Sequence, residues 1–82
     1  MAYDKLPQVG RRIQNARKRR YPKDDLAAFA ARCEISRATL HKMEQGELSI
    51  SMSRYYAVAK RLGLTEGFHR LFEEEESLFD DE

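Results

Sequence analysis

The residues with the clearest capacity for chemistry lie between positions 36 and 45, in the stretch SRATLHKMEQ. Arg37 and Lys42 carry positive charge, and Thr39 and His41 add a hydroxyl group and an imidazole ring. All four side chains can donate hydrogen bonds, so they suit a partner that is anionic and rich in acceptors. For an isolated helix, a polar face that contacts only water would be the simpler interpretation.

The sequence has few of the residue patterns that form an active site or a metal-binding site. The chain holds one Cys and two widely spaced His, too few for a zinc finger or an internal disulfide framework. No nucleophile is paired with a base, no phosphate-binding loop occurs, and the acidic run 73–76 has no His partner. We therefore predict a protein that is not an enzyme and that needs no metal or other cofactor.

The formal net charge of +1 hides an uneven distribution. Residues 1–64 contain 14 Lys and Arg against 6 Asp and Glu, a balance of +8. Residues 65–82 contain one Arg against 8 Asp and Glu, a balance of −7. A basic body indicates an anionic partner. We expect one functional domain over residues 1–72 and a flexible acidic tail over residues 73–82.

Length and apolar content exclude membrane and secreted classes. A chain of 82 residues supports one small domain. Its longest strictly apolar run, residues 26–31, is far shorter than the roughly 20 residues that cross a bilayer. The N-terminal MAYDK is not followed by the apolar stretch of a secretory signal. The expected setting is the cytoplasm, without membrane contact.

Helical periodicity recurs along the chain, whereas the alternation typical of strands is missing. Pro22 pushes the preceding residue out of the helical region, Ser36 is a good N-cap, and Gly46 and Gly63 are good helix terminators. The sequence therefore predicts an all-α protein, a compact bundle of five helices. They are expected at about 7–19, 24–32, 36–45, 51–62 and in a last helix capped by Thr65.

Each predicted helix carries an apolar stripe that is expected to face the core. The predicted inward residues are Val9, Ile13 and Ala16; Leu26, Phe29, Ala30 and Cys33; Leu40 and Met43; Met52, Tyr55, Tyr56, Ala59 and Leu62; and Phe68, Leu71 and Phe72.

Residues 25–45 form the most informative unit, two short helices joined by a four-residue turn. This is the helix-turn-helix arrangement, in which the second helix enters the DNA major groove. The groove is about 12 Å wide, admits a helix and displays distinct donor and acceptor patterns on its base edges. This context favours a DNA-reading face over a merely solvated one, above all for Arg37, which can form two hydrogen bonds to a guanine. The candidate base-reading residues are Arg37, Ala38, Thr39, His41 and Lys42.

Three stretches of the sequence resemble a known family. The segments VGRRIQNARKRR, LAAFAARCEISRATLHKMEQGE and YAVAKRLGL look like the Cro/phage-repressor (XRE-type) helix-turn-helix domain, over about residues 8–64. Within that family, the block from ISRATLHKMEQGE to TEGFHRLF most resembles the HipB-like antitoxins. The resemblance implies a lambda-repressor-like fold and a homodimer that represses its own operon. It also implies a bacterial or phage-encoded protein that is associated with the nucleoid. It also implies an operon partner of the HipA-like kinase type.

The resemblance also suggests roles for residues around the second helix of the motif. Ser36 and Gln45 stand where family members contact the DNA backbone. Arg17 stands where the family pairs an Arg with the acidic residue at Glu44, which implies a structural ion pair. The position where many members carry Gln, at the start of the first motif helix, is Leu26 here. The full set of expected phosphate contacts is Lys23, Ser36, Gln45 and Arg54.

The end of the chain has more apolar side chains than so short and acidic a segment can bury by itself. We therefore expect a two-fold dimer interface that includes Phe68, Leu71, Phe72, Leu78 and Phe79. The leading interpretation is a sequence-specific, double-stranded-DNA-binding transcriptional repressor that reads a palindromic operator as a homodimer. The alternative is a HipB-like antitoxin that chiefly binds and neutralises a HipA-like kinase toxin, with DNA autoregulation secondary.

Overall fold

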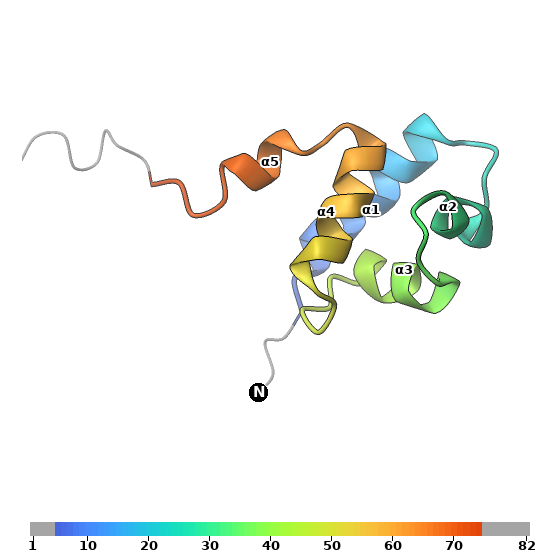
Figure 1. Cartoon of the computed structure of the whole chain (residues 1–82), viewed down its shortest axis with the longest axis horizontal. Helices are drawn as coiled ribbons and strands as arrows, with labels where there is room; N and C mark the ends of the chain where they lie inside the picture. The colour runs from blue at the N-terminus through green and yellow to red at the C-terminus, as the bar shows by residue number, and fades with distance from the viewer. Residues whose placement is uncertain (1–4, 75–82) are drawn as a thin grey trace, which may run out of the picture.

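A computed structural model describes residues 5–74 of the chain. It contains five α-helices: α1 (Pro7–Arg20), α2 (Leu26–Arg32), α3 (Arg37–Glu44), α4 (Met52–Leu62) and α5 (Glu66–His69) (Figure 1). The described residues form no β-strand, and their single β-bridge joins Lys5 to Glu47. The predicted all-α class with five helices is therefore confirmed. No helix within this part of the chain is long and apolar enough to span a bilayer.

The helix boundaries follow from local side-chain chemistry. The Asp25 carboxylate accepts a hydrogen bond from the Ala28 backbone N–H at 2.8 Å, and the Ser36 and Ser51 hydroxyls do the same for Thr39 and Arg54. These bonds satisfy backbone donors that the first helical turn leaves unpaired. At the C-terminus of α4, Gly63 adopts the left-handed conformation, with a φ of 71°.

The core lies where α1, α2, α3 and α4 meet. The helix α3 packs against both α1 and α2, and α4 packs against α1 (Figure 1). The largest fully buried side chains are Phe29, Leu40, Met43, Val58 and Leu62. The predicted stripes of α2 and α3 are confirmed, because their core residues are buried or packed against the buried cluster. The short α3 is thus held by its neighbours rather than by its own length.

Two parts of the predicted pattern are wrong. The fifth helix comprises only Glu66–His69, Thr65 makes no capping hydrogen bond, and Leu71 and Phe72 follow the helix instead of continuing its stripe. On α4, Met52 and Tyr56 are exposed rather than inward-facing. In both places apolar residues recur with helical spacing in the sequence, but no neighbouring helix within residues 5–74 covers them.

The N-terminal segment is fixed to the end of α3 by close backbone contact. The Leu6 N–H donates to the Gly46 carbonyl oxygen at 2.7 Å. Gly10 packs directly on the backbone of Glu44 and Gly46, where a Cβ atom would lie 2.5 Å from the Gly46 nitrogen. Gly46 has a φ of 78° and faces the Leu6 backbone. These two glycines let α1 and the end of α3 approach more closely than residues with side chains would allow.

Candidate nucleic-acid interface

The turn between α2 and α3 sets the orientation of α3. Glu34 takes the left-handed conformation with a φ of 61°, and the Ile35 N–H donates to the Ala30 carbonyl oxygen at 3.1 Å. Cys33 on one side of this residue is buried, and Ile35 on the other is packed against the core. A tight turn anchored on both sides therefore fixes α3 relative to α2, as a helix-turn-helix requires.

The outer face of α3 is polar and accessible. Arg37, Ala38, His41 and Lys42 are exposed, and Thr39 is half-buried. Leu40 and Met43 point into the core with no measurable exposure. Leu40 and Met43 thus anchor one side of α3 in the core. The five side chains predicted to read bases belong to the other side, which is free to contact a partner.

An ion pair connects α1 to α3. The Arg17 Nε donates to Glu44 Oε2 at 2.5 Å, and its Nη2 donates to Oε1 at 3.0 Å. Both side chains are less than a tenth exposed. The hydrogen bond to Glu44 raises the pKa of Arg17, although burial acts in the opposite direction. Glu44 is the only acidic residue of α3, so this pair leaves the outer face of the helix without negative charge.

Several predicted contact residues already form hydrogen bonds within the chain. The Ser36 hydroxyl accepts from the Thr39 N–H at 3.0 Å and donates to the Thr39 hydroxyl at 2.9 Å. At the other end of α3, the Gln45 Nε2 and the His41 Nε2 lie 3.1 Å apart, in a hydrogen bond whose direction depends on the imidazole tautomer. These bonds hold both ends of the predicted DNA face in defined orientations.

The other two expected phosphate contacts lie outside α3. Lys23 is exposed in the loop between α1 and α2, and Arg54 is exposed in the first turn of α4. Neither side chain forms an ion pair within residues 5–74. The structure therefore places both cations near helix N-termini, where backbone N–H groups and the helix dipole favour anions.

The predicted dimer residues are only partly covered by the chain itself. The Phe68 ring packs edge-on against Tyr56 of α4, with 5.3 Å between ring centroids. Leu71 is 46% exposed and Phe72 is 91% exposed. Leu78 and Phe79 lie outside the described residues. The described end of the chain therefore presents apolar surface to solvent.

A helix-turn-helix family model matches residues 23–68, which include all of α2, α3 and α4. The chain belongs to this helix-turn-helix family. It is therefore a DNA-binding transcription regulator, of a regulatory rather than an enzymatic family. Searches among curated proteins and among solved structures gave no match.

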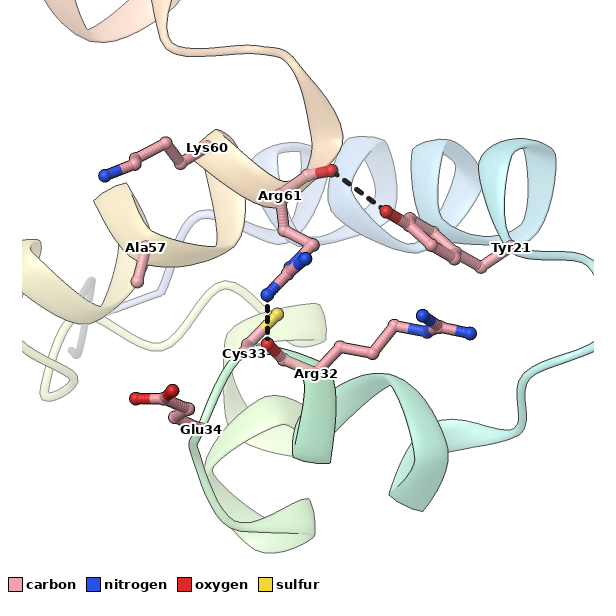
Figure 2. A pocket seen from close by; sticks show the side chains of 7 residues that line it. All are labelled: Tyr21, Arg32, Cys33, Glu34, Ala57, Lys60 and Arg61. Carbon is pink, nitrogen blue, oxygen red and sulfur yellow. Dashed lines mark hydrogen bonds between the residues drawn. The ribbon is translucent and has the colours of Figure 1, made fainter.

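Beside the motif lies a groove that the sequence pattern did not indicate. It is a hollow of about 510 Å³ between α4 and the α2–α3 turn (Figure 2). The Arg32 guanidinium carbon lies 4.8 Å from the centroid of the Tyr21 ring, and the Arg32 side chain forms an ion pair with Asp24. The hydrogen bond from Arg32 lowers the pKa of Asp24. Asp24 precedes the N-cap of α2 and Arg32 ends that helix, eight residues later. Helical spacing rules concern residues three or four apart, so they could not have predicted this ion pair.

Two other groups of the site are shielded from solvent. Burial raises the pKa of the Cys33 thiol, although the positive charge of Arg61 acts in the opposite direction. The raised pKa favours an unreactive thiol. Burial also raises the pKa of Tyr55, whose hydroxyl donates to the Glu47 carbonyl oxygen at 2.5 Å. The latter bond ties α4 to the loop that follows α3. Within residues 5–74, no group of His, Cys, Asp or Glu is arranged to hold a metal ion.

Proposed function

We propose that the chain is a sequence-specific repressor that binds a near-palindromic operator as a homodimer, with α3 in the major groove. The observation that carries this proposal is the outer face of α3. It exposes Arg37, Ala38, His41 and Lys42, while its only carboxylate is turned inward to Arg17. A helix with donors outward and no exposed acid is suited to acceptor-rich base edges between two rows of phosphates.

Base reading and phosphate binding are assigned to different residues. Arg37, in the first turn of α3, is proposed to form the two-bond contact to guanine, with His41 and Lys42 one turn further along the groove. Ala38 offers a methyl group to thymine, and Thr39 a hydroxyl. The proposed phosphate contacts are Lys23, Ser36, Gln45 and Arg54. Because the Ser36 hydroxyl is engaged in the helix cap, its contact is proposed to come from the backbone N–H.

The test compares Arg37→Ala with Lys23→Ala on duplexes selected from a random pool by the native chain. Arg37→Ala is expected to reduce discrimination between the selected site and single-base variants by about 1–3 kcal/mol, roughly 5–150-fold. Lys23→Ala is expected to weaken all duplexes alike and to reduce the salt slope of binding by about 0.9. Fluorescence anisotropy at several salt concentrations measures both. Unchanged DNA binding in both variants would refute the assigned face.

The homodimer is proposed to form through the apolar surface that follows α4. Its support is the exposure of Leu71 and Phe72 beside the Tyr56–Phe68 pair. A two-fold axis would place two copies of α3 about 34 Å apart, one turn of DNA. Light scattering at micromolar concentration should give twice the mass of the chain, and Phe72→Ser should shift it toward the monomer. A native monomer, both alone and on operator DNA, would rule the dimer out.

A second proposed function is that of an antitoxin for a HipA-like kinase. It is favoured by the 91% exposure of Phe72, which directly precedes the acidic run. Leu71, the preceding residue, is 46% exposed, and contiguous exposed apolar surface marks interaction sites. A kinase-like gene beside this one would support this function, and its product should then copurify with the native chain but less with Phe72→Ala. Equal recovery with both chains would argue against it.

A further inference from the structure

Arg61 lies where the end of α4 meets the helix-turn-helix motif. Its guanidinium donates a hydrogen bond to the Arg32 carbonyl oxygen at 2.8 Å, and its own carbonyl oxygen accepts one from the Tyr21 hydroxyl at 3.4 Å (Figure 2). Arg32 is the last residue of α2, Tyr21 directly follows α1, and Arg61 is the penultimate residue of α4. One residue therefore connects the ends of three helices.

The bond from Arg61 completes the hydrogen bonding at the end of α2. A helix leaves its last four carbonyl oxygens without a partner inside the helix. Those of Phe29, Ala30 and Ala31 accept hydrogen bonds from backbone N–H groups of the turn that follows. No backbone N–H within residues 5–74 donates to the fourth carbonyl, that of Arg32, and the Arg61 side chain takes this place.

The same bond fixes the peptide unit with which the turn begins. The Arg32 carbonyl and the Cys33 N–H belong to one planar peptide unit. Its N–H donates to the carbonyl oxygens of Phe29 and Ala30, at 3.2 and 3.0 Å, and its carbonyl oxygen accepts from Arg61. Because both polar groups of this unit are bonded, its orientation is defined. The direction in which the chain continues through the turn to α3 is defined with it.

Otherwise α4 is joined to the motif by apolar packing. Among residues 5–74, no other hydrogen bond or ion pair connects α4 with α2 or α3. Apolar contacts are not directional, whereas a hydrogen bond prefers a limited range of angles. The turn also contains Glu34 in the left-handed conformation, which persists only where surrounding contacts hold it. Arg61 supplies the directional contact between α4 and this turn.

We propose that Arg61 is a positioning residue for DNA reading, because it holds the end of α2 and thereby sets the angle at which α3 enters the major groove. This inference rests on the proposed role of α3 in base reading. None of the proposed DNA-contacting residues lines the groove around Arg61, so its effect on DNA is transmitted through the turn. Arg61 is exposed, so water can replace it at the Arg32 carbonyl oxygen and the fold as a whole should persist without it.

The test compares Arg61→Met with Lys60→Met in the full-length chain. Both changes remove one positive charge from the same groove, but the Lys60 side chain forms no hydrogen bond or ion pair within residues 5–74. Fluorescence anisotropy gives the ratio of affinities for the duplex selected by the native chain and for a scrambled duplex. Arg61→Met should lower this ratio about 5-fold or more, the smallest discrimination expected from a well-oriented two-bond guanine contact. Lys60→Met should leave the ratio unchanged.

The ratio of affinities separates positioning from stability. A loss of folded protein lowers the apparent affinity for both duplexes by the same factor, so it cannot change their ratio. The salt slope of binding in Arg61→Met should also remain native, because no phosphate contact is removed.

Amide hydrogen exchange gives a second readout, in the protein without DNA. The N–H groups of Glu34 and Ile35 each donate to a carbonyl oxygen of α2 at 3.1 Å. Both amides should exchange faster in Arg61→Met than in the native chain, because the turn opens more often, and at the native rate in Lys60→Met. Unchanged exchange in Arg61→Met would overturn the inference, and so would an unchanged affinity ratio.

Arg37→Ala, measured on the same duplexes, shows which proposal has failed. If Arg37→Ala lowers the affinity ratio and Arg61→Met does not, base reading by α3 stands and only the role of Arg61 is refuted. If neither change affects the ratio, base reading by α3 is refuted, and the inference about Arg61 with it.

Discussion

Arg17→Met is expected to lower the free energy of unfolding by about 3–5 kcal/mol, because it leaves the Glu44 carboxylate buried without its partner. The native pair is bidentate and both side chains are less than a tenth exposed, so water cannot replace the guanidinium without opening the structure. Small domains have only about 5–15 kcal/mol in total. Urea titration followed by circular dichroism should therefore show a markedly lower midpoint.

The double variant Arg17→Met/Glu44→Leu separates the ion pair from the packing around it. Replacing both charges by apolar groups of similar size is often neutral or even stabilising. The double variant should thus regain most of the loss, and it should do so even if Arg17→Met alone does not fold. Lys18→Met, next to Arg17 but exposed, is the matched control and should change stability by less than about 0.5 kcal/mol. A small effect of Arg17→Met would show that the pair is not buried in solution.

The same pair illustrates what kind of information the sequence contains. Arg17 and Glu44 are 27 residues apart, beyond any helical spacing rule, and they were paired only through the family resemblance. Local patterns, in contrast, were sufficient for the start of α3, because the Ser36 hydroxyl accepts a hydrogen bond from a backbone N–H group three residues later. Cap chemistry is local, so the cap at Ser36 can be predicted from the sequence, although the predicted cap at Thr65 forms no hydrogen bond. The partner of a buried charge depends on tertiary structure.

The two errors in the predicted pattern arise where no neighbouring element within residues 5–74 covers the apolar side chains. Phe68, Leu71 and Phe72 have helical spacing, but helices this short are unstable in water unless other elements cover them. Only Phe68 finds such a partner, in Tyr56. Tyr56 itself lies at the edge of the surface that the bundle covers, and it remains partly exposed. An apolar period thus predicts which residues need burial, but the arrangement of helices decides which of them obtain it.

The groove beside the motif could not have been predicted from local sequence patterns or from the family resemblance. Its walls come from the end of α1, the α2–α3 turn and the end of α4. Each contributes residues that look unremarkable alone, such as Ala57 or Lys60. Their proximity depends on how α4 packs on α1, and on the bond between Arg61 and the end of α2. Sites built from three separated segments require the tertiary structure, even where every helix is predicted correctly.

Gly46→Ala is expected to destabilise the fold by about 2–5 kcal/mol, the second large effect. The left-handed conformation at Gly46, with a φ of 78°, costs about 1–2 kcal/mol for a residue with a Cβ atom. The added Cβ would also collide with the Leu6 backbone, which has no side-chain rotamer to change. Overpacking of this kind costs about 1–3 kcal/mol more. Because Gly46 follows α3, the strain would fall on the link between the N-terminal segment and the DNA-facing helix.

Gly63→Ala is the matched control, because it isolates the backbone conformation from the collision. Its φ of 71° is nearly that of Gly46, but a Cβ at Gly63 would meet no atom within 4 Å. The control should therefore lose only about 1–2 kcal/mol. Parallel urea titrations measure the difference, which reports the contact between Gly46 and Leu6. Equal losses in the two variants would mean that this contact yields easily, and that the N-terminal segment does not fix the end of α3.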